Sequence, residues 1–356
     1  MQLLDRLMDH ALAVRGERTT VVIATSGDTG GAAVEAFRGH ARADVFVLFP
    51  NGRVSDVQRR MITTATDGNV HALAIEGTFD DCQAIVKGLF NDHAFREKVA
   101  LSGVNSINWA RIVAQVVYYF AAAVTLGAPH REVAFTVPTG NFGDVYAGYV
   151  ALSMGLPVNR LVIATNVNDI LARAFANGTY EPREVVATAS PSMDIQVASN
   201  FERLLFDACE RDSAALRAMM ASLAQSRRIS IPVAALSTLR KSFSAGRADE
   251  QETAVAIRTM MRETGEFIDP HGAVGVAVAE KEKREPGVPM VVLGTAHAAK
   301  FPDAVEAACG RRPQLPDWLS DLPGRPERFT TFPVNQQAVE RHILSVCRAV
   351  CEGAAL

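Results

Sequence analysis

The chain has 356 residues, enough for two domains of ordinary size, and its 48% hydrophobic and 21% charged residues are typical of a globular protein rather than a disordered or fibrous one. Its 36 basic and 39 acidic side chains give a net charge of −3, which argues against nucleic-acid binding. No apolar run approaches the roughly 18 residues that a membrane span requires. The five scattered cysteines predict reduced thiols in a cytoplasmic protein, without a disulfide framework.

The first twelve residues predict an amphipathic helix. Their apolar side chains fall on one stripe at helical spacing: Leu3, Leu4, Leu7, Met8, Ala11 and Leu12. Asp5 and Asp9 interrupt the segment, which excludes a secretory signal. No capping residue precedes the first apolar position, so the pattern is that expected of a chain that starts inside a helix.

Strand-length apolar runs and helical segments then alternate. The expected strands are 20–24, 45–49, 70–75, 133–137, 161–164 and 290–293. The expected helices are 31–37, 82–90, 109–126 and 339–350, and the stretch 214–264 is expected to be mostly helical. Short strands that are apolar on both faces and separated by helices predict parallel sheets covered on both sides.

Glycine-rich loops follow two of these strands, where ligands of parallel sheets bind. In Pro-Thr-Gly-Asn-Phe-Gly-Asp (138–144), Gly140 and Gly143 allow close backbone approach, and the next helix directs its N–H groups to the same place. That arrangement is typical of a phosphate cradle, although a tight strand-to-helix turn explains the spacing equally well. The loop lacks the Gly-Lys-Ser/Thr of nucleotide P-loops and the pattern of dinucleotide loops.

The earlier loop, residues 26–30, offers backbone donors and the hydroxyls of Ser26 and Thr29 to an anion such as a carboxylate; the alternative is a helix capped by Asp28 or Thr29. The spacing of the histidines and cysteines predicts no metal site, and no G-x-S-x-G hydrolase elbow is present. We interpret His271 and His297 as structural histidines.

Six motifs in chain order resemble the threonine synthase family in its bacterial and fungal form: residues 24–30, 76–82, 105–111, 138–144, 190–195 and 295–297. The resemblance implies an α/β fold of pyridoxal-phosphate fold type II, similar to the tryptophan synthase β subunit, with two parallel-sheet domains covered by helices and the family's amino-terminal domain missing. It divides the chain into a remaining helix (1–14), a smaller α/β domain with the substrate-carboxylate loop (15–107), and a larger cofactor-binding domain with helical insertions and the carboxy-terminal tail (108–356).

The resemblance also implies roles for particular residues. The cofactor pyridoxal 5′-phosphate (PLP) would be bound by Gly140, Asn141, Phe142 and Gly143 through its phosphate and by Thr295 through its pyridine nitrogen. The substrate carboxylate would be bound by Ser26, Gly27, Asp28 and Thr29. The substrate phosphate would be bound by Asn105, Ser106, Asn108 and Arg111, unless these form a helix N-terminus capped by Asn105 or Ser106. The segment 192–194 would lie near the pocket.

The implied activity is that of a carbon–oxygen lyase acting on a phosphate ester, which converts O-phospho-L-homoserine and water to L-threonine and phosphate. The partner is this small molecule, and no nucleic acid, membrane or metal is expected. The family's Schiff-base lysine lies in a Phe-Lys-Asp motif that this sequence lacks. The six lysines stand in other contexts: Lys87, Lys98, Lys241, Lys281, Lys283 and Lys300.

We therefore expect this amino-terminally truncated chain to be inactive alone. Two hypotheses remain: an incomplete version of a working enzyme, or a non-catalytic remnant or partner-completing chain that binds PLP or an amino acid noncovalently. The intact loops favour the first.

Overall fold

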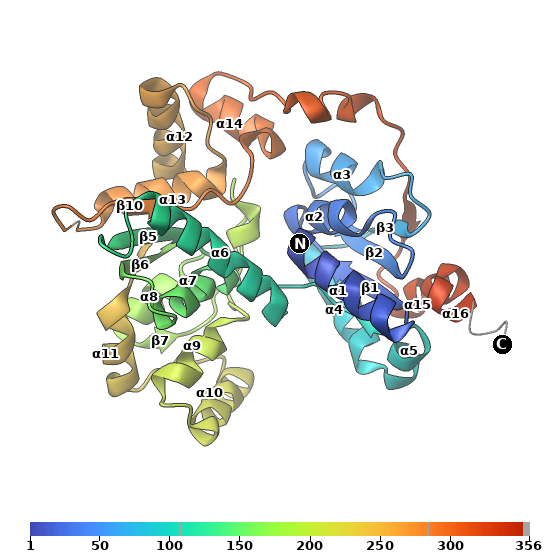
Figure 1. Cartoon of the computed structure of the whole chain (residues 1–356), viewed down its shortest axis with the longest axis horizontal. Coiled ribbons are helices and arrows are strands. Elements are labelled where there is room, and N and C mark those ends of the chain that lie inside the picture. Colours follow the sequence, from blue (N-terminus) through green and yellow to red (C-terminus); the bar gives the residue numbers. More distant parts are fainter. Residues whose placement is uncertain (107, 284, 352–356) are drawn as a thin grey trace. The chain divides into compact units, whose positions relative to one another are not determined.

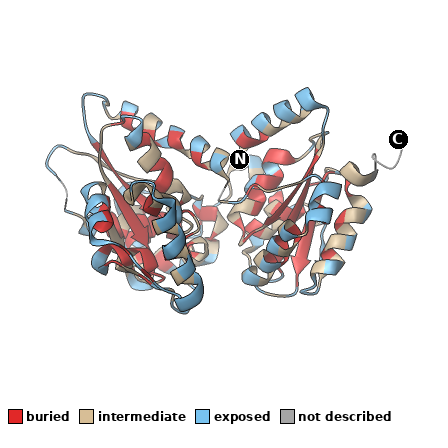
Figure 2. Ribbon diagram, turned by 90° about the horizontal axis from the view of Figure 1, so that it is seen from below, coloured by how far each residue is buried: buried red, intermediate tan, exposed pale blue. Residues whose placement is uncertain are grey.

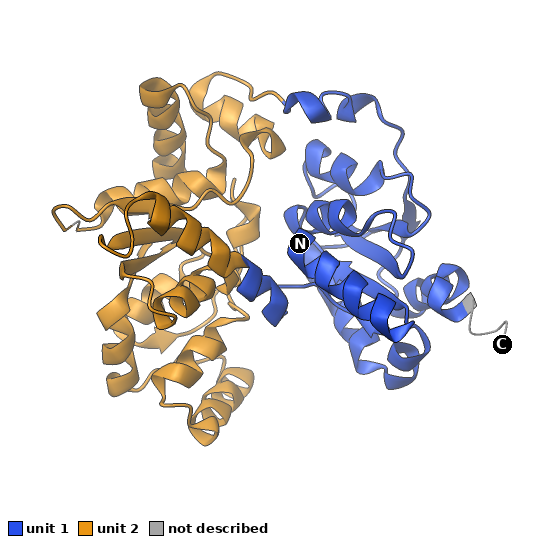
Figure 3. Ribbon diagram, in the orientation of Figure 1, with its two compact units in different colours: residues 1–114, 315–356 blue, residues 115–314 orange. Residues whose placement is uncertain are grey.

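The computed structural model describes residues 1–106, 108–283 and 285–351, and its contacts divide the chain into two compact units (Figure 3). Unit 1 contains residues 1–114 and the described part of 315–356, and unit 2 contains residues 115–314. The boundary falls within helix α6 (Trp109–Thr125). In each unit, helices surround a parallel sheet (Figure 1).

Unit 1 is built on a five-stranded parallel sheet with the order β11-β3-β2-β1-β4. Its strands are β1 (Thr19–Ala24), β2 (Ala43–Pro50), β3 (Val70–Ile75), β4 (Leu101–Ser102) and β11 (Thr330–Phe332). Its helices are α1 (Gln2–Arg15), α2 (Asp28–Phe37), α3 (Asp56–Thr63), α4 (Phe79–Asn91), α5 (His93–Lys98), α15 (Gln336–Val346) and α16 (Arg348–Cys351), with short 3-10 turns at Asp317–Leu319 and Leu322–Gly324.

Both faces of this sheet are buried, as the apolar runs predict (Figure 2). Alternate residues of β2 point to opposite faces: Val45 and Val47 pack with residues of α2 and α3, whereas Phe46 and Leu48 pack with α4 and α15. Leu4 of α1 joins the first of these cores. The expected first helix is present, and no described side chain caps it.

The described part of the carboxy-terminal segment belongs to unit 1, whereas the family resemblance placed it in the larger domain. Strand β11 pairs with β3, and Glu327 accepts hydrogen bonds from Arg59 Nε (2.9 Å) and Thr63 Oγ1 (2.7 Å) of α3. Arg348 of α16 donates through Nε to buried Asp44 on β2 (2.7 Å). These contacts involve residues far apart in sequence, which strand and helix patterns do not reveal.

Unit 1 contains a buried histidine that makes its stability depend on pH. His71 stacks on Phe46 with ring centroids 4.4 Å apart, and its Nε2 atom is buried without a hydrogen-bond partner among the described residues. Burial lowers the pKa of His71 to about 4, despite the opposing charge of Asp44; the other charged or titratable groups that face it are His342, Arg328 and Arg348.

We expect acid to destabilise unit 1 through this histidine. A histidine in the unfolded chain has a pKa of about 6.5. Below that pH, His71 is therefore protonated in the unfolded chain but stays neutral in the folded one. The free energy of unfolding therefore falls between pH 6.5 and about 4, by at most about 3 kcal/mol. His71→Phe should keep the ring stacking and make the free energy of unfolding less dependent on pH in this range. Urea unfolding at pH 7 and pH 5 measures this free energy for the wild type and the variant. An equal decrease from pH 7 to pH 5 in the two proteins would contradict the prediction.

Unit 2 is built on a four-stranded parallel sheet with the order β10-β5-β6-β9. Its strands are β5 (Val133–Pro138), β6 (Val158–Thr165), β9 (Phe243–Arg247) and β10 (Met290–Val292), and β7 (Thr179–Tyr180) pairs separately with β8 (Ile229–Ser230). Its helices are α7 (Gly143–Ser153), α8 (Ile170–Asn177), α9 (Phe201–Ala208), α10 (Ser213–Ser226), α11 (Val233–Ser242), α12 (Glu250–Thr264), α13 (Pro270–Lys281) and α14 (Pro302–Cys309), with 3-10 turns at Pro191–Met193 and Ala298–Lys300.

One face of this sheet packs on α12, α13 and α14 through Val162, Val274 and Val305. Towards α6 and α7, Tyr119 contacts the ring of Phe135 on β5 (4.9 Å between centroids) and donates to the Asp144 carbonyl (2.8 Å). The strand expected at 290–293 is present, but it is half-buried rather than buried because β10 lies at the sheet edge.

Candidate functional site

The loop after β5 has an irregular backbone that its own side chains stabilise. Thr139 donates through Oγ1 to the Val137 carbonyl (2.6 Å). Phe142 adopts a left-handed conformation (φ 67°), and its buried ring packs edge-on against Phe201 (5.3 Å between centroids). The Phe142 side chain is therefore a packing group, and only its backbone faces a ligand of this loop.

The start of α7 fits a phosphate group. No described side chain caps this helix, and Gly140, Asn141 and Gly143 are half-buried, not covered. Backbone N–H groups at an uncapped helix N-terminus are donors that an anion satisfies, and the helix dipole favours its charge. The residues present therefore match the chemistry of a cofactor phosphate.

Two further segments brace this loop. The Asn141 carbonyl accepts hydrogen bonds from the backbone N (3.1 Å) and the side-chain Nδ2 (3.0 Å) of Asn200, which is fully buried. Ser199 Oγ donates to Asn141 Oδ1 (3.2 Å). On the other side, a Cβ atom on Gly140 would overlap the Ser192 carbonyl oxygen, so only glycine allows this approach. The sequence analysis did not identify Ser199 or Asn200.

Thr295 follows the edge strand β10, which pairs with β5. The Leu293 backbone N donates to the Thr136 carbonyl (3.0 Å). The residues that follow these two parallel strands therefore lie beyond the same carboxyl end of the sheet. Thr295 is exposed there. His297 accepts a hydrogen bond at Nδ1 from the Ala299 backbone N (3.1 Å) and so caps the 3-10 turn that follows, in agreement with its structural interpretation.

The loop after β1 in unit 1 is held by a residue that the sequence analysis passed over. Thr25 Oγ1 accepts hydrogen bonds from the backbone N atoms of Gly27 and Gly30, both at 2.9 Å. The alternative of a cap at Asp28 or Thr29 is therefore wrong, because α2 already begins at Asp28 and Thr25 supplies the capping oxygen. The half-buried Ser26, Asp28 and Thr29 lie at the start of this helix.

Gly27 is a second constraint on this loop. Its φ of 135° is available to glycine, and a Cβ there would overlap the carboxamide of Gln58. Gln58 is buried and completes the capping box of α3 through its Oε1 atom, which accepts from Ser55 N (3.3 Å). The loop thus rests directly on α3.

We expect Thr25→Val to destabilise unit 1 by about 2 kcal/mol or more, because two buried N–H groups would lose their acceptor without a change in side-chain shape. Thr19→Val on the same strand is the matched control, since it removes a single hydrogen bond to the Ala100 carbonyl (2.8 Å). Urea unfolding measures both variants. A Thr25→Val loss no larger than that of the control would show that Thr25 does not organise the loop.

Residues 105, 106 and 108–111 follow β4, the neighbour of β1 in the parallel sheet, so they lie beyond the same carboxyl end of the strands as the first loop. Asn108 caps α6: its Oδ1 accepts from Ala110 N (2.9 Å) and its Nδ2 donates to the Gly103 carbonyl (2.9 Å). The cap is therefore not Asn105 or Ser106. Arg111 donates through Nη1 to the Val104 carbonyl (3.3 Å), and Asn105 is exposed.

Polar residues at the end of β6 hold the segment 181–196 in place. Asp194 Oδ1 accepts hydrogen bonds from Thr188 Oγ1 (2.7 Å), Asn166 Nδ2 (2.8 Å) and Asn168 Nδ2 (3.0 Å). Asn166 and Asn168 are almost fully buried. The sequence analysis did not identify these asparagines, although polar residues directly after a buried strand are the signal that indicates them.

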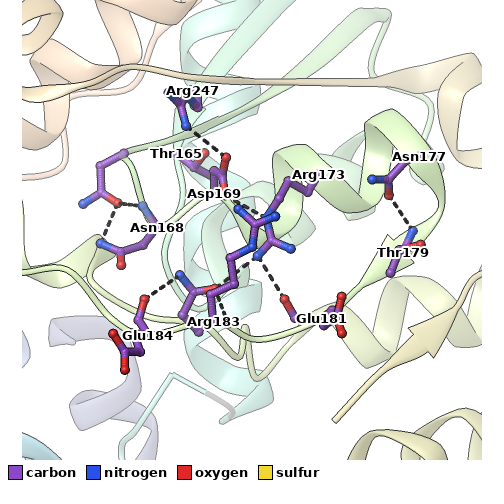
Figure 4. Close-up of polar contacts among 12 residues, drawn as sticks. Thr165, Asn168, Asp169, Arg173, Asn177, Thr179, Glu181, Arg183, Glu184 and Arg247 are labelled. Atoms are coloured by element: carbon purple, nitrogen blue, oxygen red, sulfur yellow. Dashed lines mark hydrogen bonds and ion pairs between the residues drawn. The ribbon is translucent and has the colours of Figure 1, made fainter. Parts of the chain in front are cut away.

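Arg173 of α8 also holds the segment 181–196 in place, through its first residue (Figure 4). It donates through Nε to Asp169 (2.8 Å) and through Nη2 to the Glu181 carbonyl (2.9 Å), and Arg247 contacts the other oxygen of Asp169 (3.3 Å). The side chains of Arg173 and Asp169 are largely buried, so the pair fixes the start of the segment as Asp194 fixes its end.

Residues 3–248 match the family model described as "Pyridoxal-phosphate dependent enzyme", and residues 272–343 match "Threonine synthase, C-terminal". The first match covers more than half of the chain and defines its class, the PLP-dependent enzymes. The threonine synthase of Pseudomonas aeruginosa is 51% identical over 94% of this chain and 71% of its own length, and that of Saccharomyces cerevisiae is 39% identical over 91% and 67%. The chain belongs to the threonine synthase family.

Solved structures of threonine synthases have the same fold as this chain. The PLP-bound threonine synthase from Brucella melitensis superposes with a TM-score of 0.94 at 59% identity, over 98% of this chain and 75% of that one. Yeast threonine synthase superposes with a TM-score of 0.88 at 36% identity. The expected fold, with parallel sheets covered by helices as in fold type II, is thereby confirmed.

Among the helices of the described residues, none combines the length and the apolar character that a bilayer span requires. No group of three or more histidine, cysteine, aspartate or glutamate residues in the described part is arranged to hold a metal ion.

Proposed function

We propose that this chain carries the cofactor and substrate sites of a threonine synthase, which converts O-phospho-L-homoserine and water to L-threonine and phosphate. The observation that carries the proposal is the start of α7, where an uncapped helix follows a glycine loop braced by Ser192 and Asn200. Membership of the threonine synthase family supports the reaction.

In unit 2, the backbone of Gly140, Asn141, Phe142 and Gly143 would bind the cofactor phosphate, and Thr295 would donate to or accept from the pyridine nitrogen. When bound, the cofactor supplies an electron sink that makes proton loss from the substrate possible. A hydroxyl at Thr295 carries no charge, so it would leave the ring nitrogen less protonated than a carboxylate would.

In unit 1, the start of α2 would bind the substrate carboxylate through the backbone of residues 26–29 and the hydroxyls of Ser26 and Thr29. Thr25 supports this role because it fixes the loop without occupying its outer face. Asn105, Ser106 and Arg111 would bind the substrate phosphate, with Arg111 supplying its charge. Both ends of the Asn108 amide already bond the backbone, so its role would be to shape this segment.

We further propose that the lysine which holds the cofactor and moves protons is none of the six in this chain. Lys87, Lys98, Lys241, Lys281 and Lys283 are exposed, and Lys300 lies in the turn that His297 caps. The relative from Pseudomonas aeruginosa is covered over 71% of its length and therefore contains residues without a counterpart here.

Noncovalent cofactor binding tests the proposal without requiring turnover. We expect PLP to bind with an affinity about tenfold or more above that of pyridoxal, which lacks the phosphate. The backbone N–H groups at the start of α7 would stabilise only the bound PLP, because only PLP has a phosphate for them to bind. Absorbance titration of the chain with each compound measures the ratio, and inorganic phosphate should compete with PLP. Equal affinities would contradict the proposed phosphate site.

A further inference from the structure

His271 connects helix α13 to the segment that braces the phosphate loop. Its side chain is 3% exposed, and its Nδ1 atom lies 2.6 Å from Oδ2 of Asp269, whose side chain is 2% exposed. On the other side of the ring, Nε2 accepts a hydrogen bond from the Ser192 backbone N (3.2 Å). The ring also packs edge-on against Phe301, with centroids 4.9 Å apart.

These partners determine where the imidazole carries its proton. A backbone N–H can only donate, so Nε2 must be unprotonated, and the single proton of the neutral ring lies on Nδ1. Asp269 is suited to hold it there: its Oδ1 accepts from Gly272 N (3.0 Å) and its Oδ2 from His271 N (3.0 Å), so the helix N-terminus keeps the carboxylate in place. The second ring nitrogen thus presents a lone pair to Ser192.

Ser192 in turn contacts the phosphate loop. Its carbonyl oxygen occupies the space that a Gly140 Cβ would need, and its backbone N is the atom that His271 holds. Asp194 and its asparagine partners attach the same segment to the end of β6, whereas His271 attaches it to α13. The position of Ser192 is therefore fixed by contacts with both β6 and α13, and Gly140 packs against the Ser192 carbonyl oxygen.

We propose that His271, oriented by Asp269, is a positioning residue for the cofactor-phosphate loop, which it holds through the backbone of Ser192. The identity of the ligand in this inference rests on the proposed function, whereas the contact from His271 through Ser192 to Gly140 does not. The contacts that carry the inference are those of His271 with Asp269 and with the Ser192 backbone. His271 acts as a hydrogen-bond acceptor, so its effect on Gly140 depends on the lone pair of Nε2 and not on the charge of the ring.

Two variants separate the acceptor from the volume of the side chain. His271→Gln can present an oxygen to the Ser192 N–H, whereas His271→Leu fills the space without an acceptor. In the leucine variant we expect hydrogen exchange in peptides covering 139–143 and 190–194 to accelerate about tenfold, and the ratio of PLP to pyridoxal affinity to fall about tenfold. The glutamine variant should remain close to wild type, and His130→Ala, at an exposed histidine, should change neither quantity.

A third measurement uses the wild-type chain alone. Nitrogen-15 NMR of the His271 ring should show the proton on Nδ1, and a proton on Nε2 would overturn the proposal. Equal exchange in the leucine and glutamine variants would overturn it too. If wild type binds PLP and pyridoxal equally while the leucine variant still loosens both segments, the proposed function fails and the positioning role stands.

Discussion

The chain of residues 1–356, assayed alone with PLP, will release phosphate from O-phospho-L-homoserine at least roughly 10²-fold more slowly than a full-length relative such as the Pseudomonas aeruginosa enzyme. The reaction needs an amine that both holds the cofactor and transfers protons, and such an amine works from a site shielded from water. Five of the six lysines are exposed to solvent, and Lys281 is already paired with Glu252. Phosphate release followed with a coupled assay gives the rate.

A covalent test shows whether Lys300, the remaining candidate in this chain, takes the role of the cofactor-binding amine. We expect borohydride treatment of the chain with PLP to leave no stoichiometric cofactor adduct at any single lysine, as judged by peptide mass spectrometry. The same treatment of the full-length relative is the positive control. A one-to-one adduct at Lys300 that Lys300→Met abolishes, together with turnover near that of the relative, would show that the chain contains its own catalytic lysine.

Much of the core could be predicted because its signal is local. The strands at 20–24, 45–49 and 133–137 are continuous apolar runs, and the structure has β1, β2 and β5 there. Within each sheet, β1 pairs with β2 and β5 pairs with β6 in parallel, as expected for consecutive strands that are separated by a helix. The loops after β1 and β5 were also predictable, since glycines at the carboxyl end of a strand indicate close backbone approach.

Other elements were missed because their signal is not local. The sequence of β9 (Phe243–Arg247) reads Phe-Ser-Ala-Gly-Arg, which alone does not indicate a strand; it forms because Leu161–Thr165 of β6 offers a free edge. Strand β11 has three residues, lies in a proline-rich tail, and depends on pairing with β3. The expected helix at 339–350 is divided at Cys347, which accepts or donates a hydrogen bond with Thr20 Oγ1 (2.8 Å) across 327 positions.

The candidate site shows the same division. Motifs identified Gly140 and Gly143, whereas Asn200 and His271, which support the loop after β5, are single polar residues whose partners lie far away in the sequence. His271 was interpreted as structural, and its burial agrees with that interpretation. Its contact with Ser192 could not be predicted, because the two residues lie 79 positions apart in sequence.

The second large effect is expected at Gly140. Gly140→Ala places a methyl group on the Ser192 carbonyl oxygen, and backbone atoms on both sides must move because neither is the end of a flexible side chain. We expect unit 2 to lose about 1–3 kcal/mol of stability, as overpacked sites do. The affinity for PLP should fall about tenfold or more while that for pyridoxal changes little, because the displaced loop is the one that faces the phosphate.

Gly148→Ala distinguishes this local effect from a general loss of stability. Gly148 lies in helix α7, which follows the Gly140 loop, and an added Cβ would approach the Tyr119 ring (2.6 Å) and Leu161 (2.8 Å), so this variant should also unfold at lower urea concentration. It does not contact Ser192, and we expect its ratio of PLP to pyridoxal affinity to stay near that of wild type. If both variants lower that ratio equally, the sensitivity belongs to the packing of α7 as a whole, and the close approach of Gly140 to Ser192 does not define a phosphate site.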